Sequence, residues 1–404
     1  MSQDKAQKPQ HTGLILISGV DAPGVTQALF GALEPFAITV LDIEQVVIRG
    51  RLILTALIAL DPAHAPAIET DLLAATNKLG LDLAIDFTDE AKGDVASSNL
   101  HIVALSQNLK PAGVAAIATK IAEQGGNIDR IHRTASYPLT AIAMEVTLSA
   151  AENDLKIIQR ELAEIARAND IDIAVEQSGL TRRAKRIVLL DMDSTLIQQE
   201  VIDVIATKFG VGEKVSEITE AAMRGELDFA GSLTARVGLL AGADVAILEE
   251  VAKEITLTPG ARTLIRTLHR LGHKVGVVSG GFIDVIEPLL KELSIDYYRA
   301  NKLEVTDNKL TGKITGAIID RAAKAAALRE FANSEGVSLA QTIAIGDGAN
   351  DLGMLEIAGL GIAFNAKPAV RAAASSSINS PYLDSVLYLM GITREEIESA
   401  DGSK

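Results

Sequence analysis

The chain has 404 residues, of which 48% are hydrophobic and 23% charged, and these values are typical of a folded protein with several domains, not of a disordered or fibrous one. The formal net charge of −15 disfavours non-specific binding to nucleic acid or to an anionic membrane, so an anionic substrate would have to be met by local cations or a metal ion. The absence of cysteine excludes disulfide scaffolds, zinc ribbons, iron-sulfur clusters and thiol nucleophiles, and it favours a cytoplasmic location.

The N-terminal part of the chain predicts two similar modules, at residues 12–90 and 99–178. In both, apolar runs and helical periodicity follow one another in the order βαββαβ. Pro23-Gly24-Val25 and the segment from Pro111 to Val114 hold the same place in the two modules, at the entry to the first helix. The sequence therefore predicts an internal duplication.

Polar segments at residues 89–99 and 178–185 predict linkers. The second contains a basic cluster whose members are Arg182, Arg183, Lys185 and Arg186. A nucleic-acid or phosphate patch is one interpretation, but the acidity of the whole chain favours a solvated linker.

From residue 185 to 404 the pattern changes to strands that alternate with helices, which predicts an α/β domain with a doubly wound parallel sheet. Its expected strands lie at residues 187–190, 274–278, 342–345 and 361–364, with a hairpin over 303–315. A helix is expected from Pro259, with Thr258 as its cap. The mostly helical stretch at about 201–257 interrupts this pattern after the first strand, so we expect it to form a separate cap.

Polar residues follow the predicted strands of this sheet at the points where the strands end. The segments concerned are Asp191-Met-Asp193-Ser-Thr195, Ser279-Gly280-Gly281 and Gly346-Asp347-Gly348-Ala-Asn350-Asp351. Because ligands of parallel sheets bind beyond the carboxyl ends of the strands, these groups should share one crevice. Carboxylates suit Mg²⁺, whereas glycine amides and a serine hydroxyl suit phosphate oxygens.

Other motifs fit these segments poorly. An EF-hand starting at Asp191 would need Gly where Leu196 stands and Glu where Ile202 stands. Ser279 is displaced by one position from a Gly-x-Ser-x-Gly nucleophile elbow, and no Gly-x-x-x-x-Gly-Lys loop for a nucleotide is present. By itself, an Asp-x-Asp after a strand could equally be a helix cap with a surface carboxylate.

Taken together and in this order, with Lys324 between the last two, the segments resemble the haloacid dehalogenase superfamily of phosphotransferases. The resemblance implies that Asp191 is the nucleophile and Asp193 the general acid and base. It implies a Mg²⁺ ion held by Asp191, the backbone carbonyl of Asp193, and Asp347. Further groups would hold the phosphoryl oxygens or position them: Ser279, Gly280, Lys324 and Asn350.

Within that superfamily, the chain looks like the long phosphoserine phosphatases. The resemblance implies that Glu200 pairs with the ammonium group of O-phospho-L-serine and Arg236 with its carboxylate, with Met223 and Phe229 beside them. Without the motifs, these residues would be interpreted as surface charges and ordinary cap core. The implied function is hydrolysis of O-phospho-L-serine to L-serine through an aspartyl-phosphate intermediate, in the last step of serine biosynthesis.

The duplicated N-terminal modules look like ACT domains, which are regulatory βαββαβ modules of the ferredoxin-like type. The resemblance implies a homodimer and a regulatory site for L-serine or another amino acid at Asp21, Gly24 and Gly126. The second module departs from the pattern, since it has residues 107–110 (Gln-Asn-Leu-Lys) where the first has 19–22 (Gly-Val-Asp-Ala), which argues against two equivalent ligand sites.

Two rival functions stay open. One is an enzyme of the same superfamily that acts on a different small phosphate or transfers phosphate to another alcohol. The other is an amino-acid-sensing regulator with an inactive phosphatase domain.

Overall fold

This computed structural model describes residues 10–90, 99–148, 155–223, 226–374 and 376–402. The chain forms two compact units, residues 1–96 and 97–404. Within the described ranges, no helix is both long enough and apolar enough to cross a membrane.

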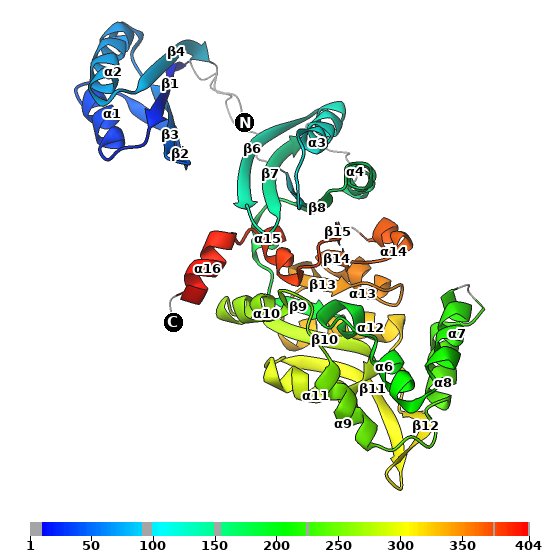
Figure 1. Ribbon diagram of the computed structural model, residues 1–404. Helices are drawn as coiled ribbons and strands as arrows, with labels where there is room; N and C mark the ends of the chain where they lie inside the picture. The colour runs from blue at the N-terminus through cyan, green and yellow to red at the C-terminus, as the bar shows by residue number, and fades with distance from the viewer. Residues whose placement is uncertain (1–9, 91–98, 149–154, 224–225, 375, 403–404) are drawn as a thin grey trace. The chain divides into compact units, whose positions relative to one another are not determined.

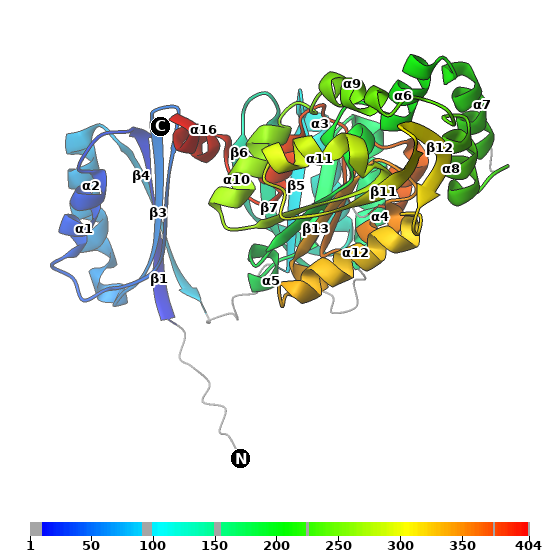
Figure 2. The same cartoon turned by 90° about the horizontal axis from the view of Figure 1, so that it is seen from below.

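The first unit is a module with an antiparallel sheet and two main helices. Its elements are β1 (Gln10–Val20), α1 (Val25–Leu33), β2 (Thr39–Ile48), β3 (Arg51–Ala59), a short 3₁₀ turn (Pro62–His64), α2 (Ala65–Leu79) and β4 (Asp82–Glu90). The sheet order is β2-β3-β1-β4, and Figure 2 shows α1 and α2 together on one of its faces. Along β1, Ile15 and Ile17 are buried whereas Leu14 and Leu16 are exposed, because neighbouring side chains of a strand point to opposite faces.

The second module repeats this arrangement. Its elements are β5 (Leu100–Ser106), α3 (Pro111–Glu123), β6 (Gly126–Ala135), β7 (Thr140–Leu148), α4 (Leu155–Asn169) and β8 (Asp172–Gln177). The sheet order β6-β7-β5-β8 is that of the first module, so the predicted duplication is present in the fold. Unlike β1, β5 is buried on both faces, since Val103 and Leu105 pack into the core of the C-terminal domain.

The C-terminal domain is built on a sheet of order β12-β11-β10-β9-β13-β14-β15. Its strands are β9 (Ile187–Leu190), β10 (Lys274–Phe282), β11 (Tyr297–Thr306), β12 (Lys309–Thr315), β13 (Thr342–Gly346), β14 (Leu360–Phe364) and β15 (Ser376–Ile378). All neighbouring pairs are parallel except β11 and β12, which form the expected hairpin. The predicted α/β fold is confirmed, with a mixed sheet in place of a purely parallel one.

Helices cover both faces of this sheet. They are α10 (Ala261–Arg270), α11 (Ile283–Glu292), α12 (Arg321–Ser334), α13 (Leu352–Ile357), α14 (Pro368–Ala373), α15 (Val386–Leu389) and α16 (Arg394–Gly402). Figure 2 shows α12 on one side of the strands, with α10 and α11 on the other. The insert between β9 and α10 consists of α6 (Val201–Phe209), α7 (Gly212–Met223), α8 (Phe229–Gly238) and α9 (Ala246–Glu254), as the composition predicted (Figure 1).

Two local expectations were wrong or incomplete. Thr258 does not cap α10: its hydroxyl donates to the carbonyl of Thr195 at 2.7 Å, and the N-cap is Gly260 in the left-handed conformation. A side chain at Gly260 would also collide with Asp384. No element was expected beyond residue 374, where the structure has β15, α15 and α16.

The second module and the C-terminal domain share buried polar contacts. Lys185 is 5% exposed and pairs with Glu176 at 2.9 Å, so this member of the basic cluster is not solvated, and the predicted linker contains a short helix, α5 (Leu180–Arg183). At the neighbouring strands β8 and β15, the backbone N–H of Asn379 donates to Asp172 at 2.8 Å. The two parts are therefore held by specific hydrogen bonds as well as by apolar packing.

Asp172 makes this contact sensitive to pH. Burial raises the pKa of Asp172 from 3.8 to about 6, in spite of the hydrogen bonds from Asn379 and the charge of Arg371. Because the folded-state pKa is the higher one, the stabilisation is complete below pH 4 and is lost as the pH rises through 6, by up to about 3 kcal/mol. The thermal midpoint of the wild type, compared with that of Asp172→Asn at the same pH, should therefore decrease as the pH is raised from 4.5 to 7.5. Glu249→Gln, at an exposed position on α9, is the control, and a difference that does not change with pH would contradict this expectation.

Candidate active site

The polar segments predicted from the sequence meet at one edge of the C-terminal sheet. β9 is the central strand, and the chain continues to β10 on one side and to β13 on the other, so the strand order reverses beside β9. Such a reversal leaves a crevice beyond the carboxyl ends of the strands. Asp191 follows β9, Ser279 and Gly280 lie near the end of β10, and Asp347 follows β13.

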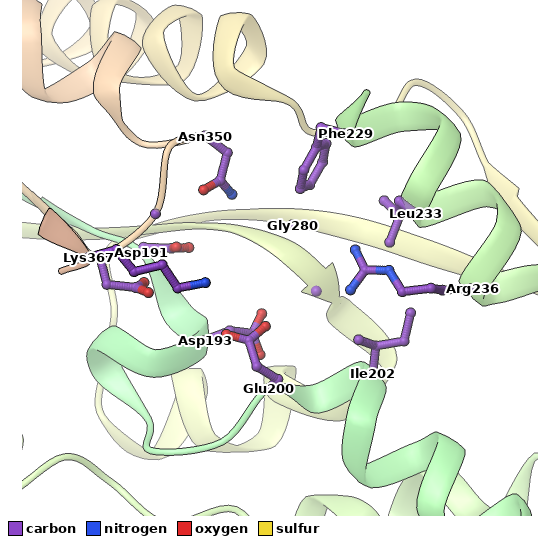
Figure 3. Close-up of a pocket in the computed structure, with 13 residues that line it drawn as sticks. Asp191, Asp193, Glu200, Ile202, Phe229, Leu233, Arg236, Gly280, Asn350 and Lys367 are labelled. Atoms are coloured by element: carbon purple, nitrogen blue, oxygen red, sulfur yellow. The ribbon is translucent and has the colours of Figure 1, made fainter. Parts of the chain in front are cut away.

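A pocket of about 190 Å³ opens at this edge, between the sheet and the helical insert. Figure 3 shows Asp191 and Asp193 on its sheet side and Phe229, Leu233 and Arg236, all from α8, on the opposite side. Its lining residues are Asp191, Asp193, Glu200, Ile202, Phe229, Leu233, Arg236, Gly280, Gly281, Asp347, Gly348, Asn350 and Lys367. The pocket thus has carboxylates at its base, while the insert contributes the positively charged side chain of Arg236 and apolar side chains.

Lys324 lies behind the pocket and is completely buried. Its Nζ is 2.7 Å from Oδ1 of Asp191 and 2.6 Å from Oδ1 of Asp351. Burial alone would lower the pKa of Lys324, but the two carboxylates raise it above its usual value, so the ammonium stays charged. Lys324 is therefore a buried, charged partner of Asp191, and this contact holds the Asp191 carboxylate in one orientation.

The carboxylates of Asp191, Asp347 and Asp351 form a compact cluster, with one oxygen from each lying within 4.8 Å of the others. Burial and the charge of Asp351 raise the pKa of Asp191 well above its ordinary value, and burial, Asp351 and Glu200 raise the pKa of Asp347 to about 7. These shifts mean that Lys324 alone does not neutralise the cluster. Carboxylate oxygens are the ligands that a hard divalent cation prefers, and such a cation would supply the positive charge that this cluster lacks.

Asp193 occupies a different environment from Asp191, although only one residue separates them. Its Oδ1 accepts a hydrogen bond from the backbone N–H of Val201 at 2.9 Å, and its Oδ2 accepts one from the hydroxyl of Ser279 at 3.3 Å. Burial and the nearby charge of Glu200 raise the pKa of Asp193 to about 7. A carboxyl group with this pKa can both give and take a proton near neutral pH.

The backbone at Ser194 and Gly281 allows the close contacts between these groups. Ser194 adopts a left-handed φ of 55°, which turns the chain after Asp193 so that its hydroxyl donates to Glu200 at 2.8 Å. A side chain at Gly281 would come within 2.6 Å of Oδ2 of Asp193, so only glycine fits there. The backbone N–H of Gly281 donates to Ser279 Oγ at 2.8 Å.

Comparison with known proteins gives the family. The haloacid dehalogenase-like hydrolase family matches residues 188–356, and ACT domain families match residues 11–86 and 98–176. A phosphoserine phosphatase of Streptomyces coelicolor is 51% identical over 396 residues, covering 96% of this chain and 94% of that protein. The corresponding values for a phosphoserine phosphatase of Mycobacterium tuberculosis are 48% identity, 96% and 95%. The chain belongs to the phosphoserine phosphatase family.

Solved structures agree with this assignment. The probable phosphoserine phosphatase of Vibrio cholerae is 33% identical and superimposes with a TM-score of 0.58, covering 76% of this chain and 91% of that one. A haloacid dehalogenase family hydrolase of Salmonella enterica gives 32% identity and a TM-score of 0.62, with coverages of 72% and 98%. The predicted haloacid dehalogenase fold with ACT domains is confirmed.

Most of the site residues expected for a phosphoserine phosphatase are brought together by the fold. The pocket wall contains Asp191, Asp193, Glu200, Phe229, Arg236, Gly280, Asp347 and Asn350, while Ser279 and Lys324 contact its carboxylates from behind. Met223 ends α7, and its side chain lies outside what the structure describes. The roles assigned to these residues stay predictions.

Three residues that line this phosphoserine phosphatase pocket were not expected from the sequence: Ile202, Leu233 and Lys367. Asp351 belongs to a segment that was expected at the crevice, but it lies behind the pocket: its Oδ1 accepts from Lys324, and its Oδ2 accepts from the N–H of Gly348 at 2.9 Å. Lys367 follows β14 and extends into the pocket (Figure 3). The rule that located Asp347, a polar residue after a parallel strand, would also have found Lys367. Ile202 and Leu233 were missed because apolar cap residues carry no such signal.

The residues expected for an amino-acid ligand lie in both compact units. Asp21 and Gly24 lie in the turn between β1 and α1, where Gly24 has a φ of 97° and open space around it. Gly126 begins β6 in the other unit, and a side chain there would collide with Leu148 and Ile121. Close packing is thus a sufficient reason for glycine at residue 126, and the ligand site stays a prediction.

Proposed function

We propose that the chain hydrolyses O-phospho-L-serine to L-serine and inorganic phosphate with the help of Mg²⁺. The observation that carries this proposal is the pairing of Asp191 and Lys324 beneath a pocket that is also lined by Glu200, beside Asp193, and by Arg236, from the helical insert (Figure 3). The first pair suits phosphoryl transfer, and the second suits the charged groups of an amino acid. The chain also aligns with nearly the full length of two phosphoserine phosphatases, which supports O-phospho-L-serine as the substrate.

In the first chemical step, a carboxylate oxygen of Asp191 attacks phosphorus while the bond from phosphorus to the serine oxygen breaks. Asp193 gives its proton to that oxygen, so L-serine leaves as a neutral alcohol. In the second step Asp193 takes a proton from water, the water oxygen attacks the aspartyl phosphate, and the bond to Asp191 breaks to release phosphate. A pKa of about 7 suits Asp193 for both transfers.

A divalent cation fits the cluster formed by Asp191, Asp347 and Asp351, to which the backbone carbonyl of Asp193 was added by resemblance. When bound, Mg²⁺ would offset the repulsion between these carboxylates and the phosphate. Lys324 holds Asp191 in one orientation. By the same resemblance, Ser279 and the amide of Gly280 would bind phosphoryl oxygens; Ser279 contacts Asp193, and Gly280 lines the pocket.

The test is phosphate release from L-phosphoserine by the purified chain with Mg²⁺, compared with EDTA, phosphothreonine and p-nitrophenyl phosphate. We expect strong, Mg²⁺-dependent release that prefers phosphoserine. A folded, metal-loaded protein that releases no phosphate from phosphoserine would overturn the proposal in favour of another substrate or an inactive, amino-acid-sensing protein. Adding an alcohol acceptor to the same assay detects phosphate transfer in place of hydrolysis.

Arg236→Lys should weaken binding of phosphoserine while sparing p-nitrophenyl phosphate, which has no carboxylate beside its phosphate. Lysine keeps the charge but cannot form the two parallel hydrogen bonds of a guanidinium group. Loss of one charge-assisted hydrogen bond corresponds to a rise in KM of roughly 10- to 100-fold. Arg262→Lys, at an exposed position on α10, is the control. Equal effects on both substrates would contradict the assigned role.

We further propose that the protein acts in the cytoplasm as a homodimer and that L-serine or another amino acid binds its ACT domains at Asp21, Gly24 or Gly126. The ACT domain matches support this assignment. Light scattering should give the mass of a dimer, and a monomer mass would count against it.

A further inference from the structure

A second cavity, of about 620 Å³, lies between the second ACT-like domain and the phosphatase domain. Strands β5, β6 and β7 form one wall, the segment that contains α5 forms another, and Met390 and Gly391, just after α15, close it. It shares no lining residue with the catalytic pocket. Its volume is in the range of small-molecule sites.

The lining is strongly basic in a chain whose net charge is −15. Arg130 and His132 come from β6, and Arg182 and Arg183 come from α5. The basic cluster of the linker thus meets basic residues of a strand about 50 residues away. Arginine forks on both sides of a cavity suit a ligand with two anionic groups, because each fork matches a carboxylate or a phosphate.

Glu145 is the acidic residue of this lining, and both of its oxygens are already engaged within the wall. Oε1 lies 2.7 Å from Nδ1 of His101, and Oε2 accepts from the hydroxyl of Ser178 at 3.0 Å. Burial alone would raise the pKa of Glu145, but these hydrogen bonds and Arg182 hold it below its ordinary value. An ionised Glu145 only accepts hydrogen bonds, so Nδ1 of His101 carries the proton.

His101 adds a second, independent feature. It is 2% exposed, and its Nε2 has no hydrogen-bond partner among the described residues. Burial and the charge of Arg182 lower the pKa of His101, so the ring is neutral and Nε2 is an acceptor. A buried acceptor without a partner costs about 1–3 kcal/mol, and a donor on a ligand would remove this cost.

We propose that this cavity binds a small dianion that carries a hydroxyl group, such as a hydroxy dicarboxylate or the phosphate ester of a hydroxy acid. Arg130 from β6 and Arg183 from α5, which lie on different walls, hold the anionic groups, and Nε2 of His101 accepts from the hydroxyl. The ligand would connect the second ACT-like domain to the segment that leads into β9 and so to Asp191. The binding site is independent of the proposed hydrolysis.

The test is calorimetric titration of the full chain with L-malate and with succinate, which differ in one hydroxyl group. We expect saturable binding of L-malate that is at least ~10-fold tighter than that of succinate. Arg130→Gln and, separately, Arg183→Gln should each weaken L-malate binding by ~10-fold or more while phosphoserine turnover without malate is unchanged. Both arginines are exposed, so these changes should not affect folding.

Arg133→Gln is the matched control, since Arg133 is an exposed arginine on the same strand that pairs with Glu395 and does not line the cavity. It should bind L-malate as the wild type does. The proposal is overturned if neither acid binds saturably, if succinate binds as tightly as L-malate, or if the Arg130 and Arg133 variants lose binding equally. Binding that only Arg236→Lys abolishes would place the ligand in the catalytic pocket and would also overturn it.

Discussion

Asp191→Asn is expected to abolish phosphate release from L-phosphoserine, by roughly 10⁴-fold or more, which is the scale of loss when a covalent nucleophile is removed. The amide should keep the geometry, because the Oδ1 atom of residue 191 can still accept hydrogen bonds from Lys324 and from the N–H of Met192. In the wild type this N–H lies 2.7 Å from Oδ1. Its oxygen, however, lacks the charge that attacks phosphorus. Phosphate release at saturating phosphoserine and Mg²⁺ measures the effect.

The fold of this variant should be intact or slightly more stable, because the change removes one of several crowded, buried carboxylates. A thermal midpoint at or above that of the wild type would show this. Asp244→Asn is the matched control: Asp244 accepts from the N–H of Ala246 in the helical insert and does not line the pocket. Substantial turnover by the Asp191 variant would mean that another group attacks phosphorus.

Lys324→Met is expected to cost both activity and stability. The buried ammonium neutralises Asp191 and Asp351, and removing one partner of a buried ion pair typically costs 3–5 kcal/mol. Loss of an electrostatic stabiliser at the reacting group should lower kcat by about 10²- to 10³-fold. Thermal unfolding without Mg²⁺ and phosphate release with Mg²⁺ measure the two effects.

Arg329→Met provides the control, because Arg329 lies exposed on the same helix as Lys324. It should leave both measurements nearly unchanged. If Lys324→Met left the thermal midpoint of the metal-free protein unchanged, the structural role of this lysine would be wrong. If it left kcat unchanged, its catalytic role would be wrong.

The catalytic edge of the sheet could be predicted because its signals are local. A short aliphatic run followed by acids at Asp191, and again at Asp347, gives both the strand and the place where it ends. Once strands are known to be parallel, their polar ends must meet. The chemical roles of these residues came instead from the resemblance to the haloacid dehalogenase superfamily, because no local pattern predicts them.

Other features depend on contacts between distant segments, which local patterns do not encode. Lys185 belongs to a polar, basic stretch, and only its pairing with Glu176 across the domain contact buries it. Asp351 was expected near the crevice, but its pairing with the buried Lys324 joins two segments that are separate in the sequence, and neither segment predicts it. The basic cavity could not be foreseen, since α5 and β6 supply its arginines from separate parts of the chain.

The shared core of the second module and the phosphatase domain bears on how this architecture can change during evolution. Val103, Leu105 and Ala135 belong to the same apolar cluster as Val188 and Leu190, whereas the first module has a core of its own. The two copies of the duplication are therefore unequal in their ties to the rest of the chain. Loss or replacement of the first would leave the core of the phosphatase domain closed, whereas a change on the inner face of the second would have to be matched by the catalytic scaffold that it packs against.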